Sequence, residues 1–411
     1  MKLKMKGLLK QTEFYVFCII VAFALIIQVR SGLFFTSNNL MDLVRSMIIP
    51  GIYAICALLS FVSTGADVSF PLIAALSAYI AVTLGNRFSL GVIPIFAIAI
   101  VVGCLIGCIN GFFIVKYKFN SLIVTLGTSS ICSGILFGTF EAGRTELPEK
   151  LYALSKINLV TVTNAKSGLS SSLPFTFVIM IVLYLIAYFI LNYTMAGRSV
   201  YAVGGDEVSA ERAGINVGKV RFLVFVVNGG IAAIAGLCYA MMSYFYLPNE
   251  YAGEEMLVIA AVVLGGTRMI GGIGTLRGCL LGTLLLTMVS NSLILLGKSI
   301  YWSNHYYRYS GIRDAGDAGI QDISKKEGGS VDMNEAKKMK KGMTLPFDEN
   351  SRRLIIILVA LLFITGITKS SQFLNRQAAH RIWSYVAWNG CLYAEWWNRS
   401  VNRLYRKSLW Y

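Results

Sequence analysis

Charged residues and histidine are scarce in this sequence. Only 14% of its 411 residues are Asp, Glu, Lys or Arg, whereas soluble domains carry about 25%. The two histidines, His305 and His380, lie far from the cysteine pair Cys104 and Cys108. Those cysteines are four residues apart in an apolar segment, where they are expected to pack and not to bind a metal. The composition excludes an ordinary soluble domain, and we expect neither a metal site nor a cofactor.

Motifs for nucleotide binding and catalysis are also missing. The nearest match to a phosphate-binding loop, "SLILLGKS" at 292–299, begins with Ser292 where glycine is needed. The glycine-rich "GGIGTLRG" at 271–278 has Arg277 in place of a fingerprint glycine, and no strand is expected before it. The chain also has no Ser-His-Asp grouping. We therefore predict no catalytic residue and no ATP hydrolysis by this chain.

Long apolar runs dominate the sequence instead. Runs of roughly 18 or more apolar residues are long enough to cross a bilayer as helices. The expected fold is all-α, a polytopic transmembrane helical bundle of about ten spans. The candidate spans are 14–29, 41–63, 69–84, 89–115, 119–140, 173–194, 219–246, 255–266, 276–297 and 353–369. The run at 255–266 is too short to cross alone, so a partial or re-entrant helix is expected there.

Lysine and arginine predict the orientation of the bundle. The net charge of +16 is concentrated at the two ends and in short loops, which fits the positive-inside rule better than nucleic-acid binding. Both termini and the loops 197–221 and 265–278 are expected in the cytoplasm, and 141–172 and 247–254 outside. The N-terminal "MKLKMKGLLK" and the apolar run after it are similar to a secretory signal. No small-residue cleavage site follows, so a retained first helix is expected.

Composition also divides the chain into parts. Residues 1–302 are expected to form the transmembrane core, 303–350 a polar insertion loop, and 351–370 the last transmembrane helix. The span count places the insertion outside, although its lysines favour the inside. Residues 371–411 form a basic, Trp-rich cytoplasmic tail, for which an interfacial helix against membrane lipid and partial disorder both stay open.

Small and polar residues mark particular spans. Gly103, Gly107 and Gly111 repeat every four residues, which favours close packing of helix backbones, and Gly278 and Gly282 repeat the spacing. Polar side chains within spans are candidates for a solute pathway, because a neutral polyol needs hydroxyl and amide groups. These candidates are Asp67, Ser69, Asn110, Thr125, Thr128 and Asn228. For Asp67, a cap on the following helix is an equally open interpretation.

The stretch "GRSVYAVGGDEVSAERAGINVGKVR" at 197–221 is polar between two apolar segments. Asp206 is expected to cap a short helix running from Glu207 to Ala213, and Gly214 to end it. Gly204 and Gly205 are expected to let the chain turn sharply into that helix. A short helix pinned between two spans can pass movement from a soluble partner to the bundle. The alternative is an ordinary cytoplasmic loop.

This stretch resembles the signature loop of the ribose-type permeases of bacterial ABC importers. "VSTGADVSF", "LIVTLGTSSICSG" and "IAAVVLGGTRMIGGIGTLRGCLLG" are similar to other motifs of that family, in the same order. The resemblance covers about residues 12–302 and the last helix. It implies a multi-pass protein of the bacterial plasma (inner) membrane. It also implies three partners: a cytosolic ABC ATPase, an extracytoplasmic sugar-binding protein and a second permease copy, identical or related.

The resemblance also assigns a role to 204–214, that of a helix coupled to the ATPase. The residues that match the family's loop are Gly204, Gly205, Asp206, Glu207, Ala210, Arg212, Ala213 and Gly214. The chain departs from the family at Ala66 and at Phe70-Pro71, near the expected pathway. The expected cargo is a sugar such as ribose, another pentose or a galactoside. Autoinducer-2 or a nucleoside is the alternative, and a self-powered secondary carrier is the rival class.

Overall fold

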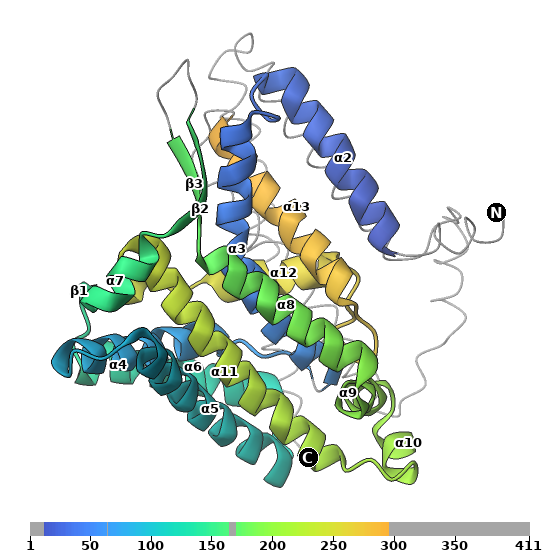
Figure 1. The fold of residues 1–411 in the computed structure, drawn as a ribbon. Helices are drawn as coiled ribbons and strands as arrows, with labels where there is room; N and C mark the ends of the chain where they lie inside the picture. The colour runs from blue at the N-terminus through green and yellow to red at the C-terminus, as the bar shows by residue number, and fades with distance from the viewer. Residues whose placement is uncertain (1–11, 64, 164–169, 296–411) are drawn as a thin grey trace, which may run out of the picture. The chain divides into compact units, whose positions relative to one another are not determined.

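The computed structural model describes residues 12–63, 65–163 and 170–295, all within one structural unit (Figure 1). The expectations for 303–350, 351–370 and 371–411 lie outside the described residues. Within these described ranges, seven helices are long and apolar enough to cross a membrane. They are α2 (Thr12–Ser31), α3 (Ser37–Ser63), α4 (Phe70–Arg87), α5 (Val92–Lys116), α6 (Ser121–Gly134) with the π-helical turn Ile135–Thr139, α8 (Thr176–Tyr193) and α11 (Val217–Ser243). Each of these helices overlaps a predicted span, while the total number of spans and the side of each terminus stay predictions.

Shorter elements join the long helices. The predicted short helix is α12 (Glu254–Leu264), and the predicted span after it is α13 (Leu276–Leu295). The other short helices are α7 (Glu149–Ser155), α9 (Met195–Gly205), α10 (Glu207–Arg212) and the 3₁₀ turn Pro248–Glu250. No sequence pattern predicted α9 as a separate helix.

The all-α expectation misses two small antiparallel sheets. Strand β1 (Thr145–Glu146) pairs with β4 (Phe245–Tyr246), and β2 (Asn158–Thr163) pairs with β3 (Ser170–Pro174). Three of these strands are short, and they fall almost entirely in a stretch that the sequence indicates only as a loop. Their apolar alternation is too brief to be distinguished from loop sequence.

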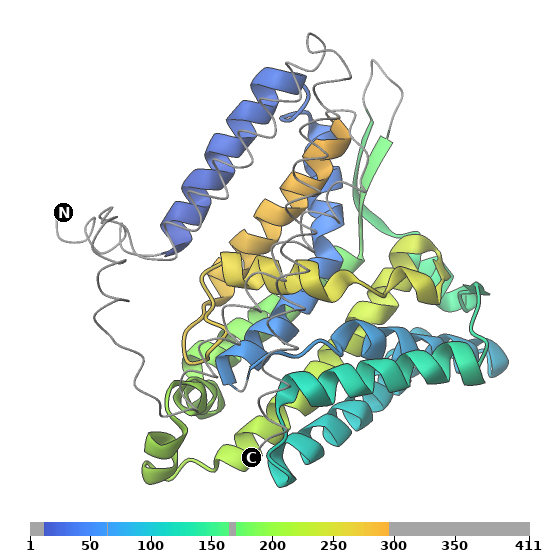
Figure 2. The ribbon, with the colours of Figure 1, turned by 180° about the vertical axis from the view of Figure 1, so that it is seen from behind.

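Helix α11 crosses the bundle, and α4 and α5 pack against one side of it (Figures 1 and 2). The glycine face of α5 makes this contact: a Cβ on Gly103 would collide with the Gly229 carbonyl, and one on Gly107 with that of Phe225. Gly278 and Gly282 of α13 meet Gly265 and Ala261 in the same way. The close packing predicted from the glycine spacing is confirmed.

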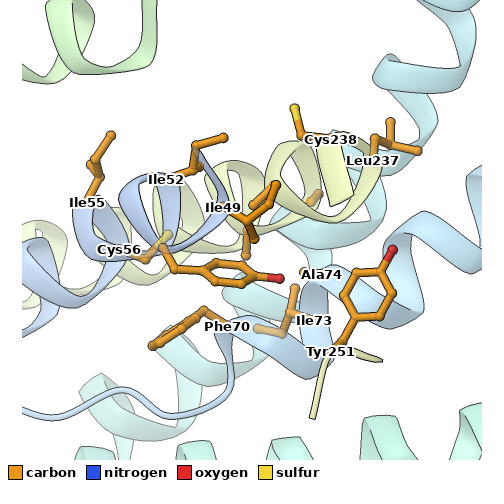
Figure 3. Packing of buried hydrophobic residues seen from close by; sticks show 14 of the residues in the cluster. Ile49, Ile52, Ile55, Cys56, Phe70, Ile73, Ala74, Leu237, Cys238 and Tyr251 are labelled. Atoms are coloured by element: carbon orange, nitrogen blue, oxygen red, sulfur yellow. The ribbon is translucent and has the colours of Figure 1, made fainter. Parts of the chain in front are cut away.

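Helix α3 supplies much of the buried interior. Ile52 and Cys56 of α3 share this interior with Phe70 and Ile73 of α4 and with Cys238 of α11 (Figure 3). The apolar run of α3 is buried on nearly every side, so its sequence carries no polar stripe. The chain leaves α3 at Ser63 and resumes helical structure only at Phe70, still within the interior. This interruption, the α3–α4 break, positions the first candidate site.

Candidate functional site

A chain of hydrogen bonds begins at the α3–α4 break. The carboxylate of Asp67 accepts hydrogen bonds from the backbone N–H of Ser69 (2.9 Å) and from its hydroxyl (2.7 Å). The amide of Asn110 on α5 donates to the Ser69 hydroxyl oxygen at 3.1 Å. Thr128 on α6 donates to the other end of the same amide, its carbonyl oxygen. Asp67, Ser69, Asn110 and Thr128 thus form one connected group, the polar cluster.

The two remaining pathway candidates adjoin the polar cluster. The hydroxyl of Thr125 accepts the backbone N–H of Val68 at 3.3 Å. The amide of Asn228 on α11 donates to the Cys56 carbonyl at 3.1 Å and to the Ser60 hydroxyl, both on α3. The Asn228 carbonyl oxygen has no hydrogen-bond partner among the described atoms. The structure therefore brings together all six residues, which along the sequence are distributed over several spans and one junction between spans.

Burial determines what the polar cluster can do. Asp67, Ser69, Asn110 and Thr125 are each at most 2% exposed, and Thr128 is 9% exposed. A buried polar group is costly unless it is hydrogen-bonded, and these groups satisfy one another. In this arrangement the polar cluster holds the irregular backbone of the break against α5 and α6. The break would have to rearrange before these groups could hydrogen-bond to a solute.

The interpretation of Asp67 as a helix cap needs a correction. The residue that precedes α4 is Ser69, whose side chain forms no capping hydrogen bond to the helix. Asp67 instead binds the N–H and the hydroxyl of Ser69, one step before the helix begins. Pro71 in the first turn leaves one helical N–H absent, so less capping is required there.

The second candidate site is α10, where the local prediction is confirmed. Helix α10 covers Glu207–Arg212, and the Asp206 carboxylate accepts the backbone N–H of Val208 at 3.1 Å. Ser209 donates its hydroxyl to the other carboxylate oxygen. These donors, the Ser209 hydroxyl first, hold the pKa of Asp206 below its ordinary value. Gly214 follows with a φ of +82°, the left-handed conformation that ends a helix.

The role expected for Gly204 and Gly205 is wrong. Both residues belong to the last turn of α9 and are not a sharp turn before α10. A Cβ on Gly204 would collide with the carbonyl of Val62 at the end of α3, and would lie 2.8 Å from the backbone nitrogen of Gly272. A Cβ on Gly205 would meet nothing within 4 Å. Gly204 is small because three backbones approach one another there.

This meeting of backbones, the glycine junction, consists of Val62, Tyr201, Gly204, Gly272 and Gly274. The N–H of Gly272 donates to the Val62 carbonyl at 3.0 Å, and the Tyr201 hydroxyl donates to the Gly274 carbonyl at 2.8 Å. Gly272 has a φ of +71°, which favours glycine. The junction fastens α9 to the end of α3 and to the loop between α12 and α13. Its glycines were visible in the sequence, but their partners were not.

Two contacts fasten α10 itself. Ala210 is buried against Val203 of α9 and Val217 of α11. The Glu207 carboxylate pairs with the Arg221 guanidinium of α11 through hydrogen bonds of 3.1 and 2.9 Å. Arg212, Ala213 and Gly214 lie exposed on the outer side. Sequence reasoning missed Arg221 as the partner of Glu207, because 14 residues and a helix end separate the two.

The described residues contain no group of three or more His, Cys, Asp or Glu side chains placed to hold a metal ion. The interactions that the structure shows at the two sites are hydrogen bonds, apolar packing and an ion pair.

Comparisons with known proteins identify transport permeases as similar to this chain. Residues 39–308 match the family described as "Branched-chain amino acid transport system / permease component". The chain is 30% identical to "Ribose import permease protein RbsC" of Haemophilus influenzae over 72% of this chain and 88% of that protein. It is 34% identical to "Autoinducer 2 import system permease protein LsrC" of Enterobacter sp. over 73% of this chain and 84% of that protein. No solved structure matches the chain significantly.

Proposed function

The chain belongs to the family of permease components of branched-chain amino acid transport systems, and we propose that it imports a sugar as the membrane subunit of an ATP-driven transporter. Its relatives are transport permeases, so the chain is a multi-pass membrane transport protein and not an enzyme. In the proposed complex a cytosolic ATPase supplies the energy. An extracytoplasmic binding protein delivers the solute, and a second permease copy completes the pathway.

The observation that carries this proposal is the construction of α10. A surface helix of six residues is marginal by itself, because short helices lose more in nucleation than they gain in hydrogen bonds. Here a cap, a buried alanine and an ion pair fix it to the bundle. Its polar outer side stays exposed. A short helix fixed in this way, with an exposed polar side, is suited to contact an ATPase and to transmit its movement to the bundle.

The path of that force runs through α11. Arg221 in α11 holds α10, and Asn228 in the same helix holds α3 beside the α3–α4 break. Seven residues separate Arg221 from Asn228, which is about 10 Å along a helix. A tilt of α10 would therefore move α11 as a rigid element and change the Asn228 contact. The polar cluster next to the break would then open to the solute.

The cargo is proposed from the relatives and from the polar cluster. Two relatives are named for ribose and autoinducer 2, both small polyhydroxy compounds. The hydroxyls and amides of the polar cluster can bind such neutral groups, and Asp67 supplies one strong acceptor. Ribose or a similar sugar is the first choice. Autoinducer 2 is the alternative, followed by a nucleoside.

A reconstitution experiment tests the proposal. The full chain is placed in lipid vesicles with the proposed partner ATPase and binding protein, and uptake of labelled ribose, galactose, autoinducer 2 and a nucleoside is measured. Uptake is expected only with all three components and ATP. Accumulation by the chain alone would establish the secondary carrier and overturn the proposal. A protease-accessibility map that places 206–214 outside would also overturn it.

A further inference from the structure

The turn between α5 and α6 gathers exposed aromatic rings. Phe112, Phe113, Tyr117 and Phe119 are each at least 40% exposed. Phe113 stacks on Tyr117 with ring centroids 5.9 Å apart, and Tyr117 stacks on Phe119 at 5.6 Å. Phe112 meets Tyr117 edge-on at 6.0 Å. The four rings form one continuous aromatic surface that the described interior does not cover.

Two lysines border these rings. The Lys116 ammonium lies 5.0 Å from the centroid of Phe112 and 6.0 Å from that of Tyr117, within the range of cation–π attraction. Lys118 has a φ of +53°, a left-handed conformation just after the helix end that glycine usually occupies. The backbone is therefore strained where this lysine is presented. We name the set Phe112, Phe113, Lys116, Tyr117, Lys118 and Phe119 the aromatic turn.

Tertiary structure adds positive charge at this end of the bundle. A Cβ on Gly218 of α11 would lie 3.1 Å from the Val115 side chain, so the first turn of α11 lies against the last turn of α5. That first turn carries the exposed Lys219. No Asp or Glu occurs between residues 88 and 140. On the neighbouring α11, Arg221 is paired with Glu207 of α10.

We propose that the aromatic turn binds the headgroup of an anionic phospholipid, with its rings in the interfacial layer and Lys116 and Lys118 on the phosphate. Aromatic rings favour the headgroup region of a bilayer, and lysines near the ends of spans extend to it. Rings alone would anchor the turn in any lipid, whereas the two lysines make the site selective for negative charge.

A second copy of this chain is a weaker candidate for the occupant. In a two-fold interface centred on this turn, the lysines of one copy would face those of the other, and like charges repel. A soluble anion would leave the four rings exposed to water. An anionic phospholipid satisfies both the rings and the charges. The proposal depends only on the geometry of the turn and stands whether or not the chain transports a sugar.

Lipid binding to the purified full chain tests the proposal. The chain in detergent is titrated with phosphatidylglycerol or phosphatidylcholine, and bound lipids are counted by native mass spectrometry. The double variant Lys116→Gln/Lys118→Gln is expected to bind phosphatidylglycerol at this site about tenfold or more weakly, and phosphatidylcholine unchanged. Equal phosphatidylglycerol affinity in the wild type and the double variant would overturn the proposal.

A matched control variant tests whether weaker binding comes from the loss of charge at this site or from the loss of net charge in general. Lys150→Gln/Lys156→Gln removes the same charge near the other end of α5, where Pro148 lies close to Ile95. Lys156 also lies over a ring, 4.3 Å from the centroid of Tyr152. This control is expected to bind phosphatidylglycerol like the wild type. An equal loss in the control would reduce the effect to net charge and overturn the site.

A third variant and a soluble competitor complete the test. Lys118→Gly removes a charge and also relieves the strain of the left-handed backbone, so weaker lipid binding by this variant is not a consequence of misfolding.

Glycerol phosphate at the same concentration is expected not to displace the lipid, because it has no acyl chains to contact the aromatic rings. Displacement by glycerol phosphate would mean a simple anion site. A dimer dissociated by the double variant would mean that a second copy occupies the turn. Either result would overturn the proposal.

Discussion

The Arg221 guanidinium on α11 donates two hydrogen bonds, of 3.1 and 2.9 Å, to the Glu207 carboxylate on α10. No other salt bridge is found among the described residues. This bidentate geometry fixes the relative orientation of the two side chains as well as the distance between them. Through this pair, a rotation of helix α10 would pull on the N-terminal part of α11. The pair is partly exposed, so its importance lies in transmitting movement more than in stability.

Neutralising this pair is expected to uncouple transport. Glu207→Gln should reduce the thermodynamic stability by no more than about 1 kcal/mol, because exposed ion pairs contribute little. Uptake per ATP hydrolysed should fall several-fold, as measured in vesicles with the ATPase and the binding protein. Exchanging the charges, with Glu207→Arg and Arg221→Glu together, should restore part of the uptake. If the exchanged pair were no better than either single variant, the coupling role of this contact would be lost.

Adjacent glycines in α9 are expected to respond very differently to the same substitution. Gly204→Ala places a methyl group against the Val62 carbonyl, and overpacking of this kind costs about 1–3 kcal/mol. Gly205→Ala adds its methyl group to open space and should be nearly neutral. Thermal unfolding of the purified chain in detergent measures both. Similar unfolding temperatures for the two variants would contradict the glycine junction.

Removing the central amide of the polar cluster is expected to destabilise the bundle. Asn110→Leu leaves the Thr128 hydroxyl without its buried acceptor, which costs about 1–3 kcal/mol, whereas the Ser69 hydroxyl keeps its hydrogen bond to Asp67. Asn192→Leu is a suitable control, since the Asn192 amide donates to its own helix at an exposed position. Chemical denaturation of the two variants provides the comparison. An Asn110 variant as stable as the Asn192 variant would show that the polar cluster does not hold the break.

The cap of α10 is expected to be lost only in acid. The folded pKa of Asp206 lies below its unfolded value, because the Ser209 hydroxyl and backbone N–H groups donate to the carboxylate. The stabilisation is therefore fully present above the unfolded pKa of about 3.9 and disappears as the pH falls through the lower folded value. Hydrogen exchange of residues 206–214 should show constant protection, corrected for intrinsic rates, from neutral pH to about pH 5 and a loss below about pH 4.

Asp206→Asn supplies the control for this pH dependence. The asparagine side chain still offers an oxygen to the Val208 N–H, and it does not titrate. Protection of α10 should then vary little with pH. If the loss in acid persisted unchanged in the variant, another group would be responsible for it.

Local features were predictable from the sequence because they depend on neighbours along the chain. Asp206 caps α10 through the N–H two residues later, and Gly214 ends it through its own φ. The glycine spacing in α5 predicted a face for close packing on the same basis. The strands β2 and β3 were missed, since the six residues of β2 and the five of β3 are too few to show a clear alternation.

Contacts between distant segments could not be predicted. Gly204 was expected to serve a turn, but its function is to let α9 approach Val62 and Gly272. No local pattern distinguishes it from Gly205. The separation of Arg221 from Glu207 likewise spans a helix end, so sequence spacing alone does not pair them.

The sequence by itself determined that this chain is a bundle of membrane-length helices, that a capped helix lies between two of them, and that a family of importer permeases shares its motifs. These properties follow from hydropathy, from hydrogen bonds between near neighbours and from residue identity. Only the tertiary structure decided that six polar residues meet at the α3–α4 break and that α11 links this break to α10. Such meetings depend on the packing of helices far apart in the sequence, where a glycine or an asparagine acquires its partner only when the chain has folded.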